Sequence, residues 1–184
     1  MQARRGSSRD DILEAAEWVV CKRGAGHLTL DAVAERAGLS KGGLLYNFPT
    51  KESLLKAMLS KLLNRVDVDC ADEKARMAGA GEVAADLKAF VRAAFREADD
   101  RQQVSAALLA AGANDPALLA PVKEWHSKRI RDYGDGKRHP LRVLMLLLAL
   151  DGLWLNELLQ TSGFGPETKA ALLQEMLAFA ETAV

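Results

Sequence analysis

The sequence predicts an all-α fold, and three observations carry this prediction. Aromatic residues make up only 5% of the 184 residues, and 14 glycines and five prolines stand in a chain rich in Ala and Leu, a composition that favours helix over strand. Between these breakers, apolar residues recur with the spacing of one helix face. At roughly 150 residues per domain, the length allows one domain or a small domain joined to a larger one.

Three short helices are expected at the N-terminus, over residues 9–23, 30–37 and 41–48. Thr29 and Ser40 precede the second and third of them as N-caps, because a hydroxyl oxygen can accept from the first free N–H groups of a helix. Gly38 stands in the turn between the two helices. Pro49 ends the third helix, since the residue before a proline is disfavoured in helical geometry.

A long helix begins at Thr50 and keeps its apolar stripe with no breaker before Gly79. A loop of small residues is expected at 77–81. Further helices are expected over residues 83–98, 101–111, 116–133, 140–160 and 166–183. The natural domain boundary lies inside the long helix, which divides the chain into a small unit of residues 1–56 and a helical bundle of residues 57–184.

The segment from residue 29 to residue 51 carries the clearest functional signal. Two short helices joined by a turn at Gly38 make a helix-turn-helix, in which Ala34 is small where the helices cross and Leu44 buries the second helix against the first. Such a unit places its second helix in the major groove of DNA. On geometry alone, an αα-hairpin inside a larger helical core is the alternative.

The residues of the third helix form a specific motif, Ser40-Lys-Gly-Gly-Leu-Leu-Tyr-Asn-Phe48, followed by Pro49-Thr-Lys-Glu-Ser-Leu-Leu55. This motif resembles the N-terminal domain of the tetracycline-repressor (TetR) family of bacterial transcription regulators, and the similarity is continuous over residues 10–63. The resemblance implies a repressor, not an enzyme. It would bind a palindromic operator in double-stranded DNA as a homodimer and be released by a small hydrophobic ligand, cationic ligands included, as in the control of an efflux pump or of neighbouring metabolic genes.

The family pattern implies DNA contacts from Thr29, Ser40, Lys41, Gly43, Leu45, Tyr46, Asn47 and Lys51. Thr29 and Ser40 would offer donors to phosphates at helix N-termini, Asn47 would reach a base edge, and Lys51 would hold a phosphate. Arginines near the N-terminus could add phosphate or minor-groove contacts: Arg4, Arg5 and Arg9. Two alternatives stay open, because Tyr46 could be a core aromatic residue and Lys51 a solvated lysine.

A ligand pocket is expected in the middle of the chain. Its candidate lining residues are Phe90, Phe95, Leu108, Trp125, Met145, Asp151 and Trp154, since apolar pockets with a few polar anchors are the usual small-molecule design. Ordinary core packing is the alternative for each of them. Asp151 interrupts the most apolar helix of the chain, and a buried carboxylate needs a partner. That partner would be a lipophilic cation held beside Trp154, a structural hydrogen bond or a contact across the dimer.

By the same resemblance, the helices at 140–160 and 166–183 would form a four-helix bundle with their twofold mates. The first of these carries more apolar residues than a helix with one buried side requires: Val143, Leu144, Leu147, Leu148, Leu150, Leu153, Trp154, Leu155 and Leu158. One side would then pack in the core of its own subunit and the other in the partner.

Composition argues against several other classes of protein. The 25 basic and 25 acidic residues give a net formal charge of zero, so a wholly electrostatic nucleic-acid binder is not expected. The longest apolar run, residues 143–150, is far shorter than the ~20 residues of a membrane span, and the N-terminus has no signal-peptide core, so we expect a cytoplasmic protein. The two cysteines and three histidines lack the spacing of metal ligands, so neither a metal nor a cofactor is expected.

Two other function classes stay open at this point. A helical-bundle enzyme is one, although the sequence lacks HxxxH, ExxH and a glycine-rich phosphate loop. The other is a helical dimer that binds another protein and has lost its affinity for DNA. The adjacent Gly42 and Gly43 and the neutral net charge are its only support.

Overall fold

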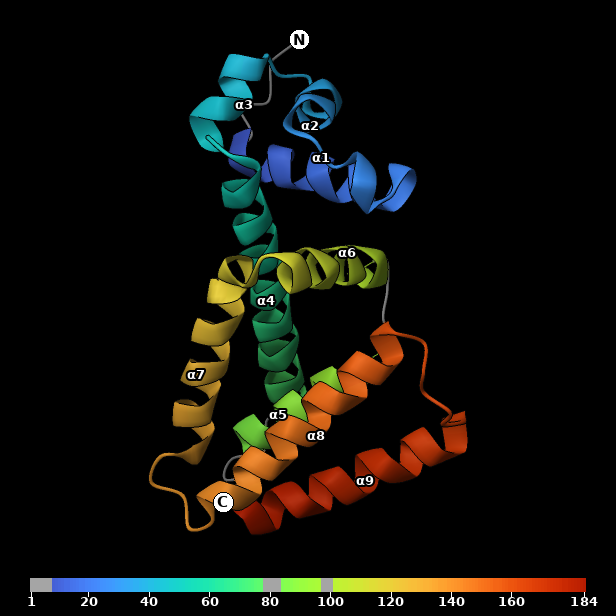
Figure 1. Cartoon of the computed structure of the whole chain (residues 1–184). Helices are drawn as coiled ribbons and strands as arrows, with labels where there is room; N and C mark the ends of the chain where they lie inside the picture. Colours follow the sequence, from blue (N-terminus) through green and yellow to red (C-terminus); the bar gives the residue numbers. More distant parts are fainter. Residues whose placement is uncertain (1–7, 78–83, 97–100) are drawn as a thin grey trace. The chain divides into compact units, whose positions relative to one another are not determined.

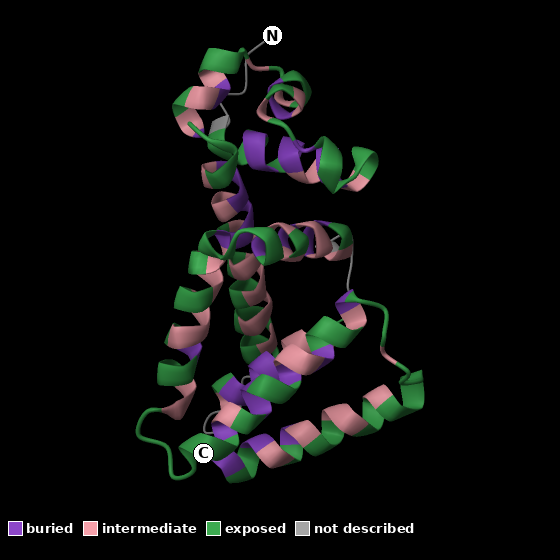
Figure 2. Cartoon of the chain, viewed as in Figure 1, coloured by how far each residue is buried: buried purple, intermediate pink, exposed green. Residues whose placement is uncertain are grey.

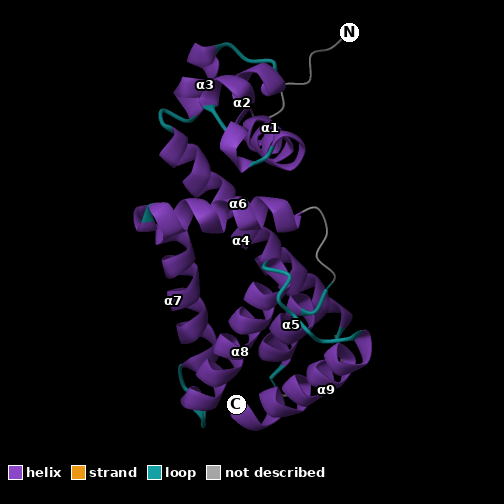
Figure 3. Cartoon of the chain, turned by 45° about the vertical axis from the view of Figure 1, so that its right-hand side comes forward, coloured by secondary structure: helices purple, strands orange, loops and turns teal. Residues whose placement is uncertain are grey.

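The computed structural model describes residues 8–77, 84–96 and 101–184, and these ranges contain helices and connecting loops but no strand (Figures 1 and 3). The all-α prediction is therefore confirmed. In chain order the elements are α1 (Ser8–Arg23), the 3₁₀ turn η1 (Ala25–His27), α2 (Leu30–Ala37), α3 (Lys41–Asn47), α4 (Lys51–Arg76), α5 (Ala85–Ala94), α6 (Arg101–Asn114), the 3₁₀ turn η2 (Pro116–Leu119), α7 (Ala120–Gly134), α8 (Pro140–Leu158) and α9 (Pro166–Ala183).

The chain divides into two compact units. The first unit comprises residues 1–62 and 99–122, and the second comprises residues 63–98 and 123–184. The long helix α4 contributes its start to the first unit and its end to the second. The boundary at residue 56, inside the long helix, stays a prediction, while packing groups α6 and η2 with the helix-turn-helix.

The first unit is built on α1, against which α2 and α3 pack (Figure 1). Its core is apolar and gathers side chains from several helices and turns. The largest fully buried members are Phe48, Ile12, Leu44, Leu54, Met58, Leu108, Val19 and Val33. Phe48 is therefore a core residue, and its burial fixes the end of α3 against the rest of the unit.

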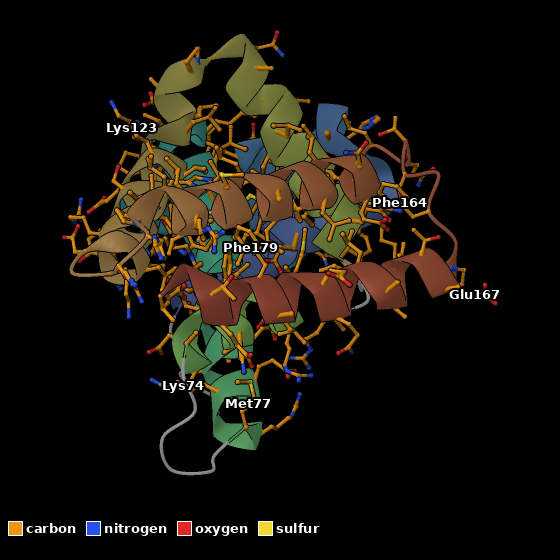
Figure 4. The ribbon with its side chains drawn as sticks, turned by 90° about the horizontal axis from the view of Figure 1, so that it is seen from below. Lys74, Met77, Lys123, Phe164, Glu167 and Phe179 are labelled. Atoms are coloured by element: carbon orange, nitrogen blue, oxygen red, sulfur yellow. The ribbon has the colours of Figure 1, made fainter. Side chains whose placement is uncertain are left out.

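The core of the second unit is formed by α5, α8 and α9. Figure 4 shows α8 and α9 running side by side, with Phe164 and Glu167 near one end of α9. One face of α8 is buried, as the purple segments of Figure 2 show, while apolar side chains on its other faces are exposed: Leu141, Met145, Leu148, Trp154 and Leu155. The predicted surplus of apolar surface on this helix is thus present in the structure.

The single helix predicted over residues 116–133 is divided in the structure into η2 and α7. Pro121 explains the break, because it has no N–H to give to the carbonyl of Ala117, and the N–H of Ala120 bonds to that carbonyl instead. Asp115 supports the turn, since its side chain accepts from the N–H of Ala117 at 3.1 Å. Most of the loop predicted at 77–81 lies outside the described residues. None of the helices in the described ranges combines the length and apolar character needed to cross a membrane.

Candidate functional site

The two short helices of the first unit are held by the predicted caps. The Thr29 hydroxyl oxygen accepts from the N–H of Ala32 at 3.1 Å, and the Ser40 hydroxyl oxygen accepts from the N–H of Gly43 at 3.2 Å. Gly38 ends α2 with a φ of 67°, in the left-handed region that glycine adopts without strain. The turn of the helix-turn-helix is thus set by local chemistry.

The third helix has one buried face and one exposed face. Leu44 is fully buried against α1 and α2, whereas Tyr46 is 89% exposed and Lys41 is exposed as well. The structure therefore excludes the alternative in which Tyr46 is a core aromatic residue. Leu45 and Asn47 are half-buried, and the Asn47 side-chain amide donates to the carbonyl of Gly43 at 3.0 Å. We call the face formed by Lys41, Gly42, Leu45 and Tyr46 the α3 surface.

The start of α4 adds a further exposed cation. Thr50 and Ser53 cap this helix reciprocally, because the Ser53 N–H donates to the Thr50 hydroxyl at 3.0 Å and the Thr50 N–H donates to the Ser53 hydroxyl at 3.2 Å. Lys51 stands in the first turn and is exposed. The cap thus fixes the point from which the Lys51 side chain extends.

Arg9 is the one N-terminal arginine of the predicted set that lies in the described part of the chain, since Arg4 and Arg5 fall outside it. Its guanidinium carbon is 4.5 Å from the centroid of the Phe48 ring, and its Nη1 donates to the carbonyl of Asn47 at 3.5 Å. Arg9 therefore contacts the C-terminal end of α3 from α1, next to the α3 surface.

In the second unit, three of the seven predicted ligand residues line one cavity. Phe90, Trp125 and Asp151 line a cavity of about 50 Å³ together with His126, Arg129, Ile130, Leu144, Leu147 and Leu148. We call it the smaller cavity. Its volume holds only a few waters, so a drug-sized ligand requires it to open.

The other four predicted ligand residues do not line this cavity. Phe95 is half-buried beside the core of the second unit, and Leu108 is buried in the core of the first unit. Met145 and Trp154 lie on α8 with exposed fractions of 61% and 47%. The apolar pattern placed all four on helices, but it did not determine which unit or which side of the helix receives them.

Asp151 has a partner in the structure. Its carboxylate lies 3.7 Å from Nδ1 of His126, and both side chains are about half-buried. Burial raises the pKa of Asp151 above its ordinary value, while the charges of His126 and Arg129 oppose that rise. The contact with His126 supports a structural role for Asp151. The carboxylate also lines the smaller cavity, so a role in ligand binding stays open.

Arg129, a buried arginine that the sequence analysis did not single out, makes several contacts in the second unit. Nη2 of Arg129 donates to the Asp67 carboxylate at 2.6 Å, and Nη1 donates to the Tyr133 hydroxyl at 3.1 Å. The guanidinium carbon lies 3.8 Å from the centroid of the Trp125 ring and 4.0 Å from that of Phe90. We call Asp67, Phe90, Trp125, Arg129 and Tyr133 the Arg129 cluster.

The cluster also has internal contacts that do not involve the arginine. The Trp125 Nε1–H donates to the Asp67 carboxylate at 3.1 Å. The Phe90 and Tyr133 rings are stacked with their centroids 5.9 Å apart. Burial raises the pKa of Tyr133 to about 12, so this hydroxyl keeps its proton at neutral pH while it accepts from Arg129. One sequence signal could have identified part of the cluster, because Trp125, Arg129 and Tyr133 recur every four residues on one face of α7.

A larger cavity of about 310 Å³ lies on the same cluster. Asp67, Trp125, Arg129 and Tyr133 line it together with Cys70, Ala71, Lys74, Asp86, Ala89, Lys128 and Asp132. Its volume is at the lower end of the ~300–1,000 Å³ range of small-molecule sites. Trp125 and Arg129 line both cavities and so stand at their common wall.

Two family models match the chain. The model described as bacterial regulatory proteins, tetR family, matches residues 12–58, and the model described as tetracyclin repressor-like, C-terminal domain, matches residues 84–181. The second match alone covers more than half of the chain.

Individual proteins are also similar to the chain, two of them in sequence and one in structure. The HTH-type transcriptional regulator TtgR of Pseudomonas putida is 40% identical over 55 residues, which are 30% of this chain and about a quarter (26%) of that protein. The HTH-type transcriptional regulator BetI of Paraburkholderia phymatum is 29% identical over 180 residues, covering 89% of this chain and 87% of that protein. A crystal structure of the multidrug binding protein EbrR complexed with ethidium has a TM-score of 0.69 at 23% identity, covering 92% of this chain and 98% of that one. This last similarity shows a shared fold.

Proposed function

The chain belongs to the TetR family of bacterial transcriptional regulators, and we propose that it is a repressor that binds a palindromic operator as a homodimer and is released by a small hydrophobic ligand. The observation that carries the DNA-binding part is the exposure of Tyr46 and Lys41 on a short helix whose opposite face, at Leu44, is fully buried. A large aromatic side chain that is 89% exposed gains nothing from the fold and is available to a partner. Since the target is DNA, the site of action is the cytoplasm.

The roles of the individual residues follow from their positions. Thr29 and Ser40 each accept one cap bond and keep their own hydroxyl hydrogen, which can be donated to a phosphate. Lys51 is a phosphate contact, and Tyr46 hydrogen-bonds to or packs on the DNA backbone. Gly43 allows close approach of the helix, while Lys41, Leu45 and Asn47 meet base edges in the major groove, Leu45 through a thymine methyl.

A second copy of this chain is the partner that covers α8. The apolar residues exposed on and beside this helix form the proposed dimer surface with α9: Leu141, Met145, Leu148, Trp154, Leu155, Leu159 and Phe164. A twofold dimer buries the same patch on both subunits. On a palindromic operator its two recognition helices would lie ~34–36 Å apart, one turn of DNA, unless a pair of dimers shares a longer site.

The effector is a small hydrophobic molecule that enters the cavities of the second unit. Phe90 and Trp125 supply aromatic wall, and Asp151 supplies a carboxylate that anchors a cationic effector. The ethidium complex of the structurally similar EbrR supports this choice of ligand class. The enzyme alternative is set aside, because the family consists of DNA-binding regulators.

Selection from random-sequence DNA followed by a gel shift tests the proposal. We expect a palindromic sequence to be enriched and to bind a protein of dimeric mass in sedimentation at micromolar concentration. Lys51→Ala should weaken binding to all sequences about equally and lower the slope of log K against log salt by about one for each site. Lys137→Ala, an exposed lysine of the second unit, is the matched control. If no sequence is enriched, or the mass is monomeric, the proposal is wrong.

A further inference from the structure

The Arg129 cluster has the composition of a receptor for a cation. Aromatic faces lie 3.8 and 4.0 Å from the guanidinium carbon, on Trp125 and Phe90, and a carboxylate oxygen of Asp67 lies 2.6 Å from Nη2. The ring of Tyr133 is the third aromatic wall, with its centroid 5.8 Å from the same carbon. Rings and a carboxylate arranged in this way attract cations through the negative face of the π system and through charge.

We propose that Asp67, Phe90, Trp125 and Tyr133 form a binding site for a planar organic cation of the guanidinium or amidinium class, and that the Arg129 side chain is its resident occupant in the ligand-free protein. An effector of this class binds by displacing Arg129 into solvent. The effect on the operator rests on the proposed function, but the occupancy of the site by Arg129 does not.

Arg129 is held firmly enough to fill the site but is not fully satisfied there. Its side chain is only 7% exposed, and in the described part of the chain its buried Nε has no hydrogen-bond partner. A buried donor without a partner costs free energy. Its carboxylate partner Asp67 is 46% exposed, so water and salt weaken that ion pair. Both features lower the cost of exchanging the side chain for a ligand.

Displacement of Arg129 would also enlarge the space available to a ligand. Its side chain and that of Trp125 line both the smaller and the larger cavity. Movement of Arg129 away from the cluster therefore opens the space between them to a ligand larger than a guanidinium group. A planar cation with an attached apolar body fits this combination of charge and volume.

The shape of the site predicts selectivity between cations. A guanidinium group can stack flat on the Trp125 ring and donate two parallel hydrogen bonds, whereas an alkylammonium is a compact charge that cannot do both. Ethylguanidinium and ethylammonium have the same charge and a similar apolar group, and so they form a matched pair of probes.

Thermal unfolding of Arg129→Ala with these probes tests the vacated site. We expect millimolar ethylguanidinium to raise the Tm of Arg129→Ala by several degrees more than equal ethylammonium does, and to leave the wild type unchanged. The control is Arg142→Ala, which removes a guanidinium 5.6 Å from the centroid of the Phe179 ring in the same unit. The two probes should act alike on this control. Equal action of both on Arg129→Ala as well would overturn the proposal.

A fluorescence titration measures how much the Asp67 carboxylate contributes to binding, apart from the aromatic rings. With Trp18 and Trp154 replaced by Phe, Trp125 is the remaining tryptophan of the three, and its fluorescence reports on the site. Ethylguanidinium should bind Arg129→Ala at least tenfold more tightly than the wild type, and Arg129→Ala/Asp67→Asn should lose at least tenfold of that affinity. Equal affinities of the three proteins would mean that Arg129 and Asp67 are only structural.

A third experiment uses the wild-type protein, so it remains informative if Arg129→Ala does not fold. Phenylglyoxal labels accessible arginines, and mass spectrometry of peptides identifies the labelled residue. We expect Arg129 to be protected in the free wild type and to be labelled when benzamidinium saturates the protein. Continued protection at saturation refutes displacement. Since none of the three experiments uses DNA, these results stand independently of whether an operator is found.

Discussion

Lys41, the first residue of α3, forms an ion pair with Asp31 of α2, with Nζ and Oδ1 2.9 Å apart. Both side chains are largely exposed, and the pair joins the two helices of the helix-turn-helix. In the free protein, the lysine assigned to the DNA groove is therefore already paired with a carboxylate. If Lys41 contacts DNA as proposed, it would exchange this partner for the nucleic acid and leave the Asp31 carboxylate without its cation.

Replacing that carboxylate should strengthen DNA binding. We expect Asp31→Asn to raise the affinity for operator and for random DNA by about two- to fivefold, the range of an exposed ion pair, because Lys41 no longer has to be released. Fluorescence anisotropy with both DNAs measures the change. Glu35→Gln is the control, since Glu35 also lies on α2 and pairs with Arg23 at 3.6 Å, away from α3. An unchanged or lower affinity of Asp31→Asn would contradict the exchange.

The two glycines of α3 should respond differently to alanine. A Cβ at Gly42 meets nothing within 4 Å, whereas a Cβ at Gly43 lies 3.4 Å from the capping hydroxyl of Ser40. Gly42→Ala should therefore raise the free energy of unfolding by about 0.5–1 kcal/mol, through the lower entropy cost of fixing alanine in a helix, and Gly43→Ala should raise it less. Urea unfolding followed by circular dichroism compares the two variants. The reverse order would show that the cap at Ser40 does not restrict position 43.

Sequence reasoning worked where the determining contacts are local. Thr29, Ser40 and Gly38 act within three or four residues of their own positions, so cap and turn rules place α2 and α3 correctly. The stripe of α4 and the proline near the start of α8 are local signals of the same kind. The burial of Leu44 was also predicted, but the sequence left open whether Tyr46 is a core residue, and the structure shows it exposed.

The second unit could be predicted only in part, because its contacts join distant residues. Arg129 and Asp67 are 62 positions apart, and no local pattern pairs them. Leu108 has the apolar spacing of a core residue, but α6 packs in the first unit, where Leu108 joins the core and lines neither cavity. On α8, which is apolar on several sides, spacing alone could not determine that Met145 is exposed and Leu146 is buried.

The free energy of unfolding between about pH 4 and neutrality should depend on Asp151. Burial raises the pKa of its carboxyl in the folded protein, so the folded state favours the protonated acid. The contribution of this group to stability is then fully present below its unfolded pKa and is lost as pH rises through the folded pKa. Asp151→Asn should become more stable relative to wild type as pH rises from about 4 towards neutrality. Urea unfolding across this range measures the difference, and a difference that does not change with pH would show that the carboxyl is not perturbed.

The coupling between effector and operator is the final prediction. Lys51 lies in the first turn of α4 and Asp67 lies on the same helix, so a ligand that shifts the end of α4 also shifts its start. Effector and operator should then weaken each other's binding by the same factor, roughly 5- to 150-fold. Fluorescence anisotropy can follow the release of labelled operator by a lipophilic cation and by a neutral hydrophobe.

The wild type and Asp151→Asn should be titrated side by side with the control variant Asp135→Asn. Asp135 is an exposed residue that lines neither cavity. If Asp151 anchors a cationic effector, Asp151→Asn loses release by the cation but keeps operator affinity, dimer mass and the response to the neutral hydrophobe. Equal release of all three proteins by the cation would refute the anchor role. Loss of the folded dimer in Asp151→Asn alone would instead assign the carboxylate to the structural contact with His126, which lies 3.7 Å away.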